Sequence, residues 1–198
     1  MKKWLVPLLI IVALFMWGGS KYNGMVVLRN NAETAWSKVE SSYQRRNDLI
    51  GNLVKTVQGA ADFEKSTLTD VISARAKATS VNINAGDLTP DKMAQFQQAQ
   101  SGLTGALSKL LVSVERYPDL KANRNFLELQ SQIEGTENRI NVVRDRYNDE
   151  VNKYDTKIDQ FPNNIFAGIF GMKQMPRYKA DPGSEKAPDV NFDFGNKK

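Results

Sequence analysis

The feature of this sequence that most constrains its fold is a repeat of apolar residues at alternating spacings of three and four. The repeat covers residues 32–74, 93–117 and 126–161. In a helix, this spacing places the apolar side chains on one stripe, which leaves water only by packing against the stripe of another helix. The sequence therefore predicts an all-α fold in which long helices pack side by side along their length.

The lengths of the segments determine how many helices are expected. The first helical segment, residues 22–80, would be about 88 Å long if it were straight, against about 42 Å and 64 Å for the second and third. Gly51 is the expected point of a bend or reversal, because glycine weakens a helix by about 1 kcal/mol relative to alanine. We therefore predict an elongated antiparallel bundle of four segments. A long bent three-helix coil is the alternative, since the repeat passes Gly51 without a change of phase.

An apolar run, "WLVPLLIIVALFMW", occupies residues 4–17 near the N-terminus. Its length matches the core of a signal peptide, and "GGS" at 18–20 offers small residues for cleavage. The apolar character resumes at 25–28, and a helix from residue 4 to 28 would be about 37 Å long, enough to cross a bilayer. We predict an uncleaved membrane anchor, with a cleaved signal peptide as the alternative.

The chain divides into three predicted parts. They are an anchor at 1–21 with its transmembrane helix at about 4–20, a helical bundle at 22–161, and an irregular tail rich in proline and glycine at 162–198. Within the tail, the apolar stretch "NNIFAGIFGM" is expected to pack back on the bundle or to contact the membrane surface. The small difference in lysines across the anchor favours a cytoplasmic N-terminus and a bundle outside the inner membrane.

The composition excludes several kinds of chemistry. The chain has no cysteine and no histidine, so it has no disulfide, thiol nucleophile, Cys/His zinc site or histidine acid–base catalysis. Its net charge of +5 comes without a basic stripe interleaved with aromatic residues, so no nucleic-acid binding is expected. Acidic residues alternate with arginines as on solvated helix faces. We therefore predict no catalytic residue, no metal site and no cofactor.

Five positions of the apolar repeat are polar: Arg46, Glu64, Thr67, Gln100 and Thr136. The candidate structural or interaction residues are Arg45, Arg46, Asp48 and Glu64. The first three could form a site for an anion or a partner. The favoured interpretation is structural: Arg46 pairs with a carboxylate such as Glu134 or Glu137 and fixes the register of the helices. Glu64 needs a partner of its own, because it lies about 27 Å further along a straight helix.

Three stretches resemble the LemA family of membrane-anchored bacterial proteins. They are "YNGMVVLRNNAETAWSKVESSYQRRNDLIGNLVKTV" at 22–57, "ERYPDLKANRNFLELQSQIEGTENRI" at 115–140, and "RDRYNDEVNKYD" at 144–155. They occur in the family's order across nearly the whole chain. Gly51 replaces a usual proline, and Phe63 replaces a common histidine. The resemblance implies an N-terminal transmembrane helix and an all-helical bundle, and it implies no defined activity.

These features together predict a single-pass, membrane-anchored helical scaffold or protein-interaction protein that is not an enzyme. Its expected partners are the lipid bilayer and other membrane or envelope proteins, with a homo-oligomer as a further option. The alternative is a membrane-anchored or secreted enzyme that uses carboxylates, without histidine or cysteine, in a cleft between helices.

Overall fold

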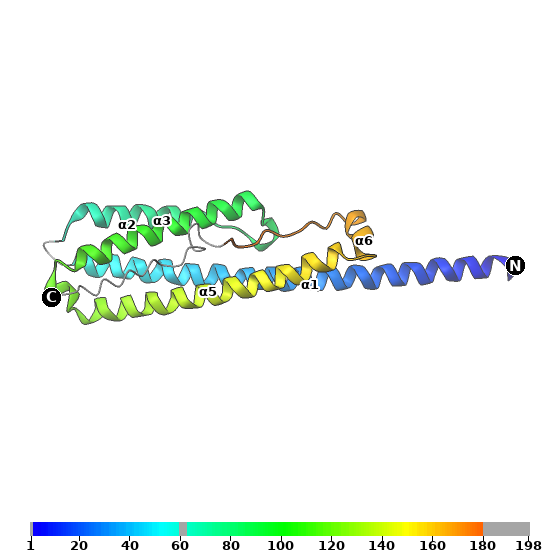
Figure 1. The fold of residues 1–198 in the computed structure, drawn as a ribbon, viewed down its shortest axis with the longest axis horizontal. Helices are drawn as coiled ribbons and strands as arrows, with labels where there is room; N and C mark the ends of the chain where they lie inside the picture. The colour runs from blue at the N-terminus through cyan, green and yellow to red at the C-terminus, as the bar shows by residue number, and fades with distance from the viewer. Residues whose placement is uncertain (1, 60–62, 180–198) are drawn as a thin grey trace, which may run out of the picture.

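The structure, a computed structural model, describes residues 2–59 and 63–179, and within these ranges every regular element is a helix (Figure 1). The elements are α1 (Lys2–Gln58), α2 (Lys65–Ser80), the short 3-10 helix η1 (Ala85–Asp87), α3 (Pro90–Val114), α4 (Pro118–Lys121), α5 (Arg124–Asp159) and α6 (Asn163–Ile169). The predicted all-α class is confirmed.

The helices form an elongated antiparallel bundle around α1. Helix α5 runs back along α1, and α2 and α3 cover the C-terminal half of α1 as the other two members of the bundle (Figure 1). The N-terminal part of α1 projects beyond every other described element, and α6 lies where α5 ends (Figure 1). The bundle thus has one end formed by α4 and the tip of α1, and another end from which the apolar part of α1 emerges.

The predicted break at Gly51 is wrong, because α1 continues through this residue to Gln58. The chain reverses between α1 and α2 instead. Gly51 makes room for Arg75 of α2, whose Nε donates a hydrogen bond of 2.7 Å to the backbone oxygen of Asn47. A Cβ atom at position 51 would lie 3.0 Å from the Arg75 guanidinium carbon. The glycine therefore allows a close contact between two helices rather than ending one.

The later reversal also shifts the predicted apolar stripe beyond Gln58. Glu64 was expected on the stripe, but it is exposed at the N-terminal cap of α2. The buried side chains around this turn are Phe63 and Leu68, in place of the predicted Glu64 and Thr67, whereas Val71 is buried as predicted. A new helix starts with its own rotational phase, so a repeat read through a turn assigns the wrong residues to the core.

The centre of the bundle is held by a cluster of aromatic rings. Trp36 of α1 is fully buried, and its ring centroid lies 5.6 Å from that of Phe96 and 5.3 Å from that of Tyr147. The indole Nε1 donates a hydrogen bond of 2.9 Å to the backbone oxygen of Ile83. Because Ile83 lies between α2 and α3, this bond ties the connecting loop to α1.

The helix starts follow from local capping. Thr89 accepts a hydrogen bond of 3.3 Å from the backbone nitrogen of Lys92, and Pro90 is the first residue of α3, as the sequence predicted. The Asn123 side chain accepts hydrogen bonds from the backbone nitrogens of Asn125 and Phe126 at the start of α5. These caps satisfy backbone donors that the first helical turn leaves unpaired.

The tail predicted from residue 162 begins with helix α6 rather than with irregular chain. Residues 172–179, called the strap below, then return along α5. Tyr147 donates a hydrogen bond of 2.6 Å to the Pro176 oxygen, and the Asp155 carboxylate accepts from the Met175 backbone and from Arg177. The strap thereby fastens the chain that follows α6 to α5. The remainder of the predicted tail, residues 180–198, lies outside the described residues.

We expect Gly51→Ala to leave the free energy of unfolding nearly unchanged. The gain of about 1 kcal/mol in helix propensity is offset by the loss of the Arg75–Asn47 hydrogen bond, also worth about 1 kcal/mol. In an Arg75→Ala background, the same substitution stabilises by about 1 kcal/mol. Urea unfolding of the full chain in detergent, followed by circular dichroism, measures both values.

The matched control is Gly105→Ala in α3, where an added Cβ meets no atom within 4 Å. This substitution stabilises by about 1 kcal/mol in both backgrounds. An identical effect of Gly51→Ala with and without Arg75 would contradict the role assigned to the glycine.

Candidate functional site

Four polar side chains from three helices meet inside the bundle and form what is called here the polar layer. Arg46 of α1 is only 2% exposed. Its guanidinium donates to Glu137 Oε2 of α5 at 2.7 Å, to Gln100 Oε1 of α3 at 2.7 Å, and to the Thr104 hydroxyl of α3 at 3.3 Å. Glu137 is one of the two partners that the sequence predicted. The other, Glu134, instead accepts a hydrogen bond from Gln130.

The polar layer sets the alignment of α1, α3 and α5. A buried guanidinium loses its hydration, so its burial is costly unless it is paired with an anion and hydrogen-bonded. Sliding any one helix by a turn moves its acceptor about 5.4 Å away from Arg46. The arrangement is therefore stable in one register, which is the role of a buried polar residue in a helical bundle.

The two members of the ion pair differ in exposure. The side chain of Glu137 is 41% exposed, whereas that of Arg46 is 3% exposed. Arg46 also stacks over the Tyr43 ring, with its guanidinium carbon 4.9 Å from the centroid. Loss of the carboxylate would leave a buried cation, while loss of the arginine leaves a carboxylate that water reaches. The layer is thus more sensitive to removal of Glu137.

A cavity of about 150 Å³ opens beside the polar layer. Arg46 Nε and Gln97 Nε2 have no protein partner there. Burial raises the pKa of Tyr178, on the same cavity wall, so its phenol stays neutral in the physiological range. The space is comparable to that of a few water molecules, at about 30 Å³ each. The cavity is therefore a small polar recess beside the polar layer.

The remaining candidate residues do not join Arg46 in one site. Arg45 and Asp48 are exposed on α1, and Asp48 lies 3.9 Å from Arg75 of α2. Glu64 accepts hydrogen bonds from the Ser66 hydroxyl at 2.8 Å and from Arg116 at 3.0 Å. These two donors hold the pKa of Glu64 below its ordinary value. Arg46 and Glu64 each have their own partner, but Glu64 acts at the surface.

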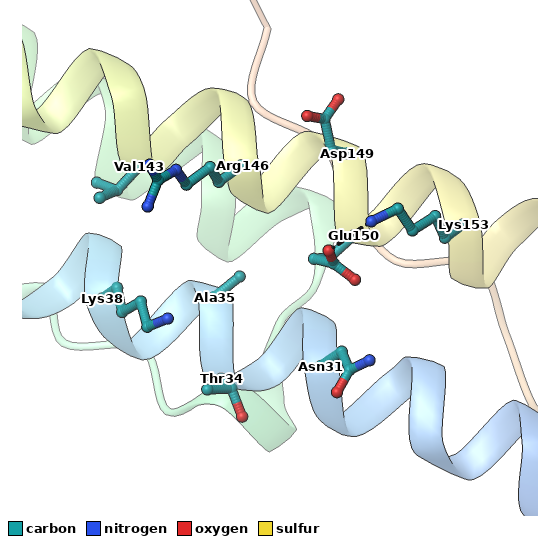
Figure 2. Close-up of a pocket in the computed structure, with 9 residues that line it drawn as sticks. All are labelled: Asn31, Thr34, Ala35, Lys38, Val143, Arg146, Asp149, Glu150 and Lys153. Atoms are coloured by element: carbon teal, nitrogen blue, oxygen red, sulfur yellow. Dashed lines mark hydrogen bonds and ion pairs between the residues drawn. The ribbon is translucent and has the colours of Figure 1, made fainter.

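A polar groove of about 290 Å³ lies between α1 and α5 (Figure 2). Its α1 residues precede Arg46 and so lie toward the N-terminal end of that helix. It is lined by Asn31, Thr34, Ala35 and Lys38 of α1 and by Val143, Arg146, Asp149, Glu150 and Lys153 of α5. Ala35 and Val143 are its buried apolar side chains, and three cations and two carboxylates surround them. Five of the nine residues that line this α1–α5 groove are charged.

The charged groups of the groove are unevenly paired. Lys153 donates a hydrogen bond of 2.7 Å to Glu150, and this bond raises the pKa of the lysine. Figure 2 shows the Arg146 guanidinium directed into the space between the two helices, with Lys38 on the opposite wall. Asp149 points away from Glu150, so the two carboxylates do not face each other across the groove (Figure 2). The two carboxylates of the groove therefore do not form an opposed pair, whereas Arg146 and Lys38 lie on facing walls.

Sequence reasoning missed this groove. Its residues recur every three or four positions on each helix, which reads as an ordinary solvated face until the pairing of α1 with α5 is known. The described residues also contain no group of three or more histidine, cysteine, aspartate or glutamate side chains placed to hold a metal ion.

The apolar N-terminal part of α1 is long enough and apolar enough to cross a membrane, by length and composition. Its side chains between Leu8 and Trp17 include several that are exposed, such as Phe15 and Met16, so this part is not the core of the bundle. A signal sequence near the N-terminus shares these properties. The structure thus joins a packed helical bundle to an apolar helix that suits a membrane anchor or a signal.

These features define a class of proteins in which an antiparallel helical bundle continues directly from an apolar N-terminal helix. The sequence profile of the LemA family matches residues 35–192, and the chain belongs to this family.

The chain is also similar to individual proteins along most of its length. The chain is 24% identical over 184 residues to magnetosome protein MamQ 2 of Paramagnetospirillum magneticum, covering 83% of this chain and 67% of the relative. It has the same identity and coverage with magnetosome protein MamQ of Magnetospirillum gryphiswaldense. It is 25% identical over 166 residues to protein LemA of Metamycoplasma hominis, covering 84% of this chain and 72% of the relative. None of these names defines an activity.

We expect Glu137→Ala to destabilise the bundle more than Arg46→Met does. The first leaves a buried guanidinium without its counter-ion, at a cost of about 3 kcal/mol. The second leaves Gln100 without its partner and Glu137 in contact with water, at a cost of about 1 kcal/mol. The free energies of unfolding in urea give the comparison. A larger loss for Arg46→Met would show that the polar layer is not organised around the buried cation.

The lowered pKa of Glu64 predicts a dependence of stability on pH. Its ionised form is favoured in the folded state, so the contribution is present above the unfolded-state pKa of 4.5 and is lost as the pH falls through the lower folded-state pKa. Glu64→Gln removes this contribution. The melting temperature of the parent should exceed that of the variant at pH 7, and the difference should shrink to zero in acid. A difference that stays constant from pH 7 to pH 3 would refute the assignment.

Proposed function

We propose that this chain is a single-pass membrane protein whose helical bundle stands outside the inner membrane as a scaffold for other membrane or envelope proteins. The observation that carries the proposal is the continuity of α1, which runs without interruption from the apolar segment to the far end of the bundle. The proposed partner surface is the α1–α5 groove. We propose no catalytic role for the chain.

The continuity of α1 supports a scaffold because it fixes the distance between the groove and the bilayer surface. Helix α1 has 57 residues and is therefore about 85 Å long. Its groove residues, 31–38, lie about 15 to 25 Å along the helix from Lys21, at the end of the apolar segment. A protein docked in the groove would be held at a set distance from the bilayer surface.

The chemistry of the groove supports an acidic partner segment. Lys38 and Arg146 face the groove from different helices, while Glu150 is engaged by Lys153. An arginine and a lysine on opposite walls suit carboxylates presented by one helix or loop, since arginine binds carboxylates in a bidentate manner. Such charged contacts favour specificity and rapid association over high affinity. This chemistry fits a reversible interaction with an acidic segment of a membrane or envelope protein.

Site-specific photocrosslinking in intact cells tests this proposal. A photoreactive residue at Thr34, on the wall of the groove, should give a discrete crosslinked species. The same residue at Thr69, exposed on α2, should not give that species. Combining the Thr34 probe with Lys38→Glu and Arg146→Glu should reduce the crosslinked species at least about tenfold, because like charges then face the partner.

The matched controls make the same charge change on the same two helices, at positions outside the groove. They are Lys55→Glu on α1 and Arg139→Glu on α5, both exposed and absent from the groove lining. These variants should retain the Thr34 product. Equal products from Thr34 and Thr69, or equal losses with the two pairs of variants, would contradict the groove as the partner surface.

A further inference from the structure

Helix α6 has one buried face and one exposed apolar face. Its Ala167 packs with Met25 of α1 and with Tyr154 and Ile158 of α5. On the other side, Ile165 is 54% exposed and Ile169 is 70% exposed. The neighbouring Phe170 is also exposed, and Phe161, just before the helix, is 80% exposed. The exposed group of Phe161, Ile165, Ile169 and Phe170 is called the α6 surface below.

The position of α6 along α1 is fixed by ring contacts. The Phe166 ring lies edge-on to Trp17 at 5.6 Å, and the Phe170 ring lies 4.6 Å from that of Tyr22. Gly18 permits the approach, because a Cβ atom there would lie 3.1 Å from the Phe166 ring. Helix α6 is therefore held at the level of residues 17–22 of α1.

This level corresponds to a definite depth in a bilayer. The part of α1 that projects beyond α6, residues 2–17, is about 24 Å long. The hydrocarbon core of a bilayer is about 30 Å thick. If α1 spans the membrane, the apolar core extends past residue 17 and the interfacial layer lies around residues 18–25. The α6 surface then falls at the boundary between acyl chains and headgroups.

We infer that the α6 surface is a second membrane contact, which inserts into the outer edge of the bilayer beside the transmembrane segment. This inference rests on the proposed function, because it requires α1 to span the membrane. The occupant is the lipid bilayer: Phe170 of the surface contacts Tyr22, which follows the apolar part of α1, and aromatic and apolar residues are the ones that favour this depth.

The charges around α6 suit an anionic lipid surface. Lys21 lies over the Trp17 ring, with its Nζ 5.7 Å from the centroid, and Lys173 is exposed just after α6. Of the nearby carboxylates, Asp155 is paired with Arg177, whereas Asp159 accepts from the neutral Gln174 amide and keeps its charge. Lysines at the headgroup level add attraction to anionic lipids. The α6 surface thus combines apolar insertion with positive charge at its edge.

Spin labelling of the full chain tests the inference, because a chain without cysteine accepts a single label at any introduced cysteine. Ile165→Cys and Ile169→Cys report on the α6 surface. Val112→Cys and Leu127→Cys serve as controls, because these apolar residues are exposed in α3 and α5 toward the other end of the bundle. Each labelled protein is reconstituted in vesicles of phosphatidylethanolamine and phosphatidylglycerol, and circular dichroism checks that it is folded.

Labels at 165 and 169 should be at least about fivefold less accessible to a polar nickel chelate than labels at 112 and 127, because the chelate is excluded from apolar lipid. They should also be more accessible to oxygen, which dissolves in acyl chains. Equal accessibility to the chelate at all four positions would overturn the inference. Protection accompanied by dipolar broadening between labels would also overturn it, since a second copy would then cover the surface.

Extraction of the same vesicles with alkaline carbonate separates this inference from the proposed function. Protein that resists extraction while its label at Ile169→Cys is fully open to the chelate would remain a membrane-spanning scaffold without the second contact. Protein that is released by carbonate would overturn the spanning anchor, and the inference with it.

Discussion

The structure depends on the need to cover the apolar stripe of one very long helix. Helix α1 presents buried side chains from Met25 to Val57, and one partner helix can cover this stripe from one side only. Helix α5 covers one side along most of the stripe. Helices α2 and α3 cover the other side only in the half that ends at Gln58, and the strap and α6 complete the coverage toward the apolar N-terminal part of α1. Burial of apolar area at about 25 cal/mol per Å² is the force that assembles these pieces around α1.

Within this apolar core, the polar layer selects one arrangement among several. Stripes of leucine, isoleucine and valine can slide past one another at little cost, because they are chemically alike. The buried Arg46 has acceptors on α3 and α5, and it finds them in one alignment only. The layer lies close to the aromatic cluster around Trp36, so directional hydrogen bonds and interlocking rings both act near the middle of the bundle.

The sequence predicts those parts of the fold that depend on local periodicity. The spacing of apolar residues is sufficient for the helical class, and capping residues such as Thr89 are sufficient for the start of α3. The predicted break at Gly51 is wrong because helix propensity contains no information about Arg75, which approaches from another helix. The prediction that Glu64 lies on the apolar stripe is wrong because the rotational phase of a helix is lost at a turn. The partner of Arg46 is predictable as a carboxylate on the third helix, since a buried cation requires one. The α1–α5 groove is not predictable, because it is made by segments that meet only after folding. The sequence did indicate that residues 163–172 pack back on the bundle or contact a membrane surface, but not which of their side chains stay exposed.

The unbroken course of α1 also has a mechanical consequence. From Tyr22 to Gln58 the helix is about 55 Å long, so if α1 spans a bilayer as proposed, the bundle is a lever arm joined directly to the spanning part. Transmembrane helices tilt by about 20° on average, and the angle responds to bilayer thickness. A change of about 10° at the bilayer would sweep the far end sideways by about 10 Å, given that length. Local lipid thickness would in this way be converted into a displacement far from the membrane.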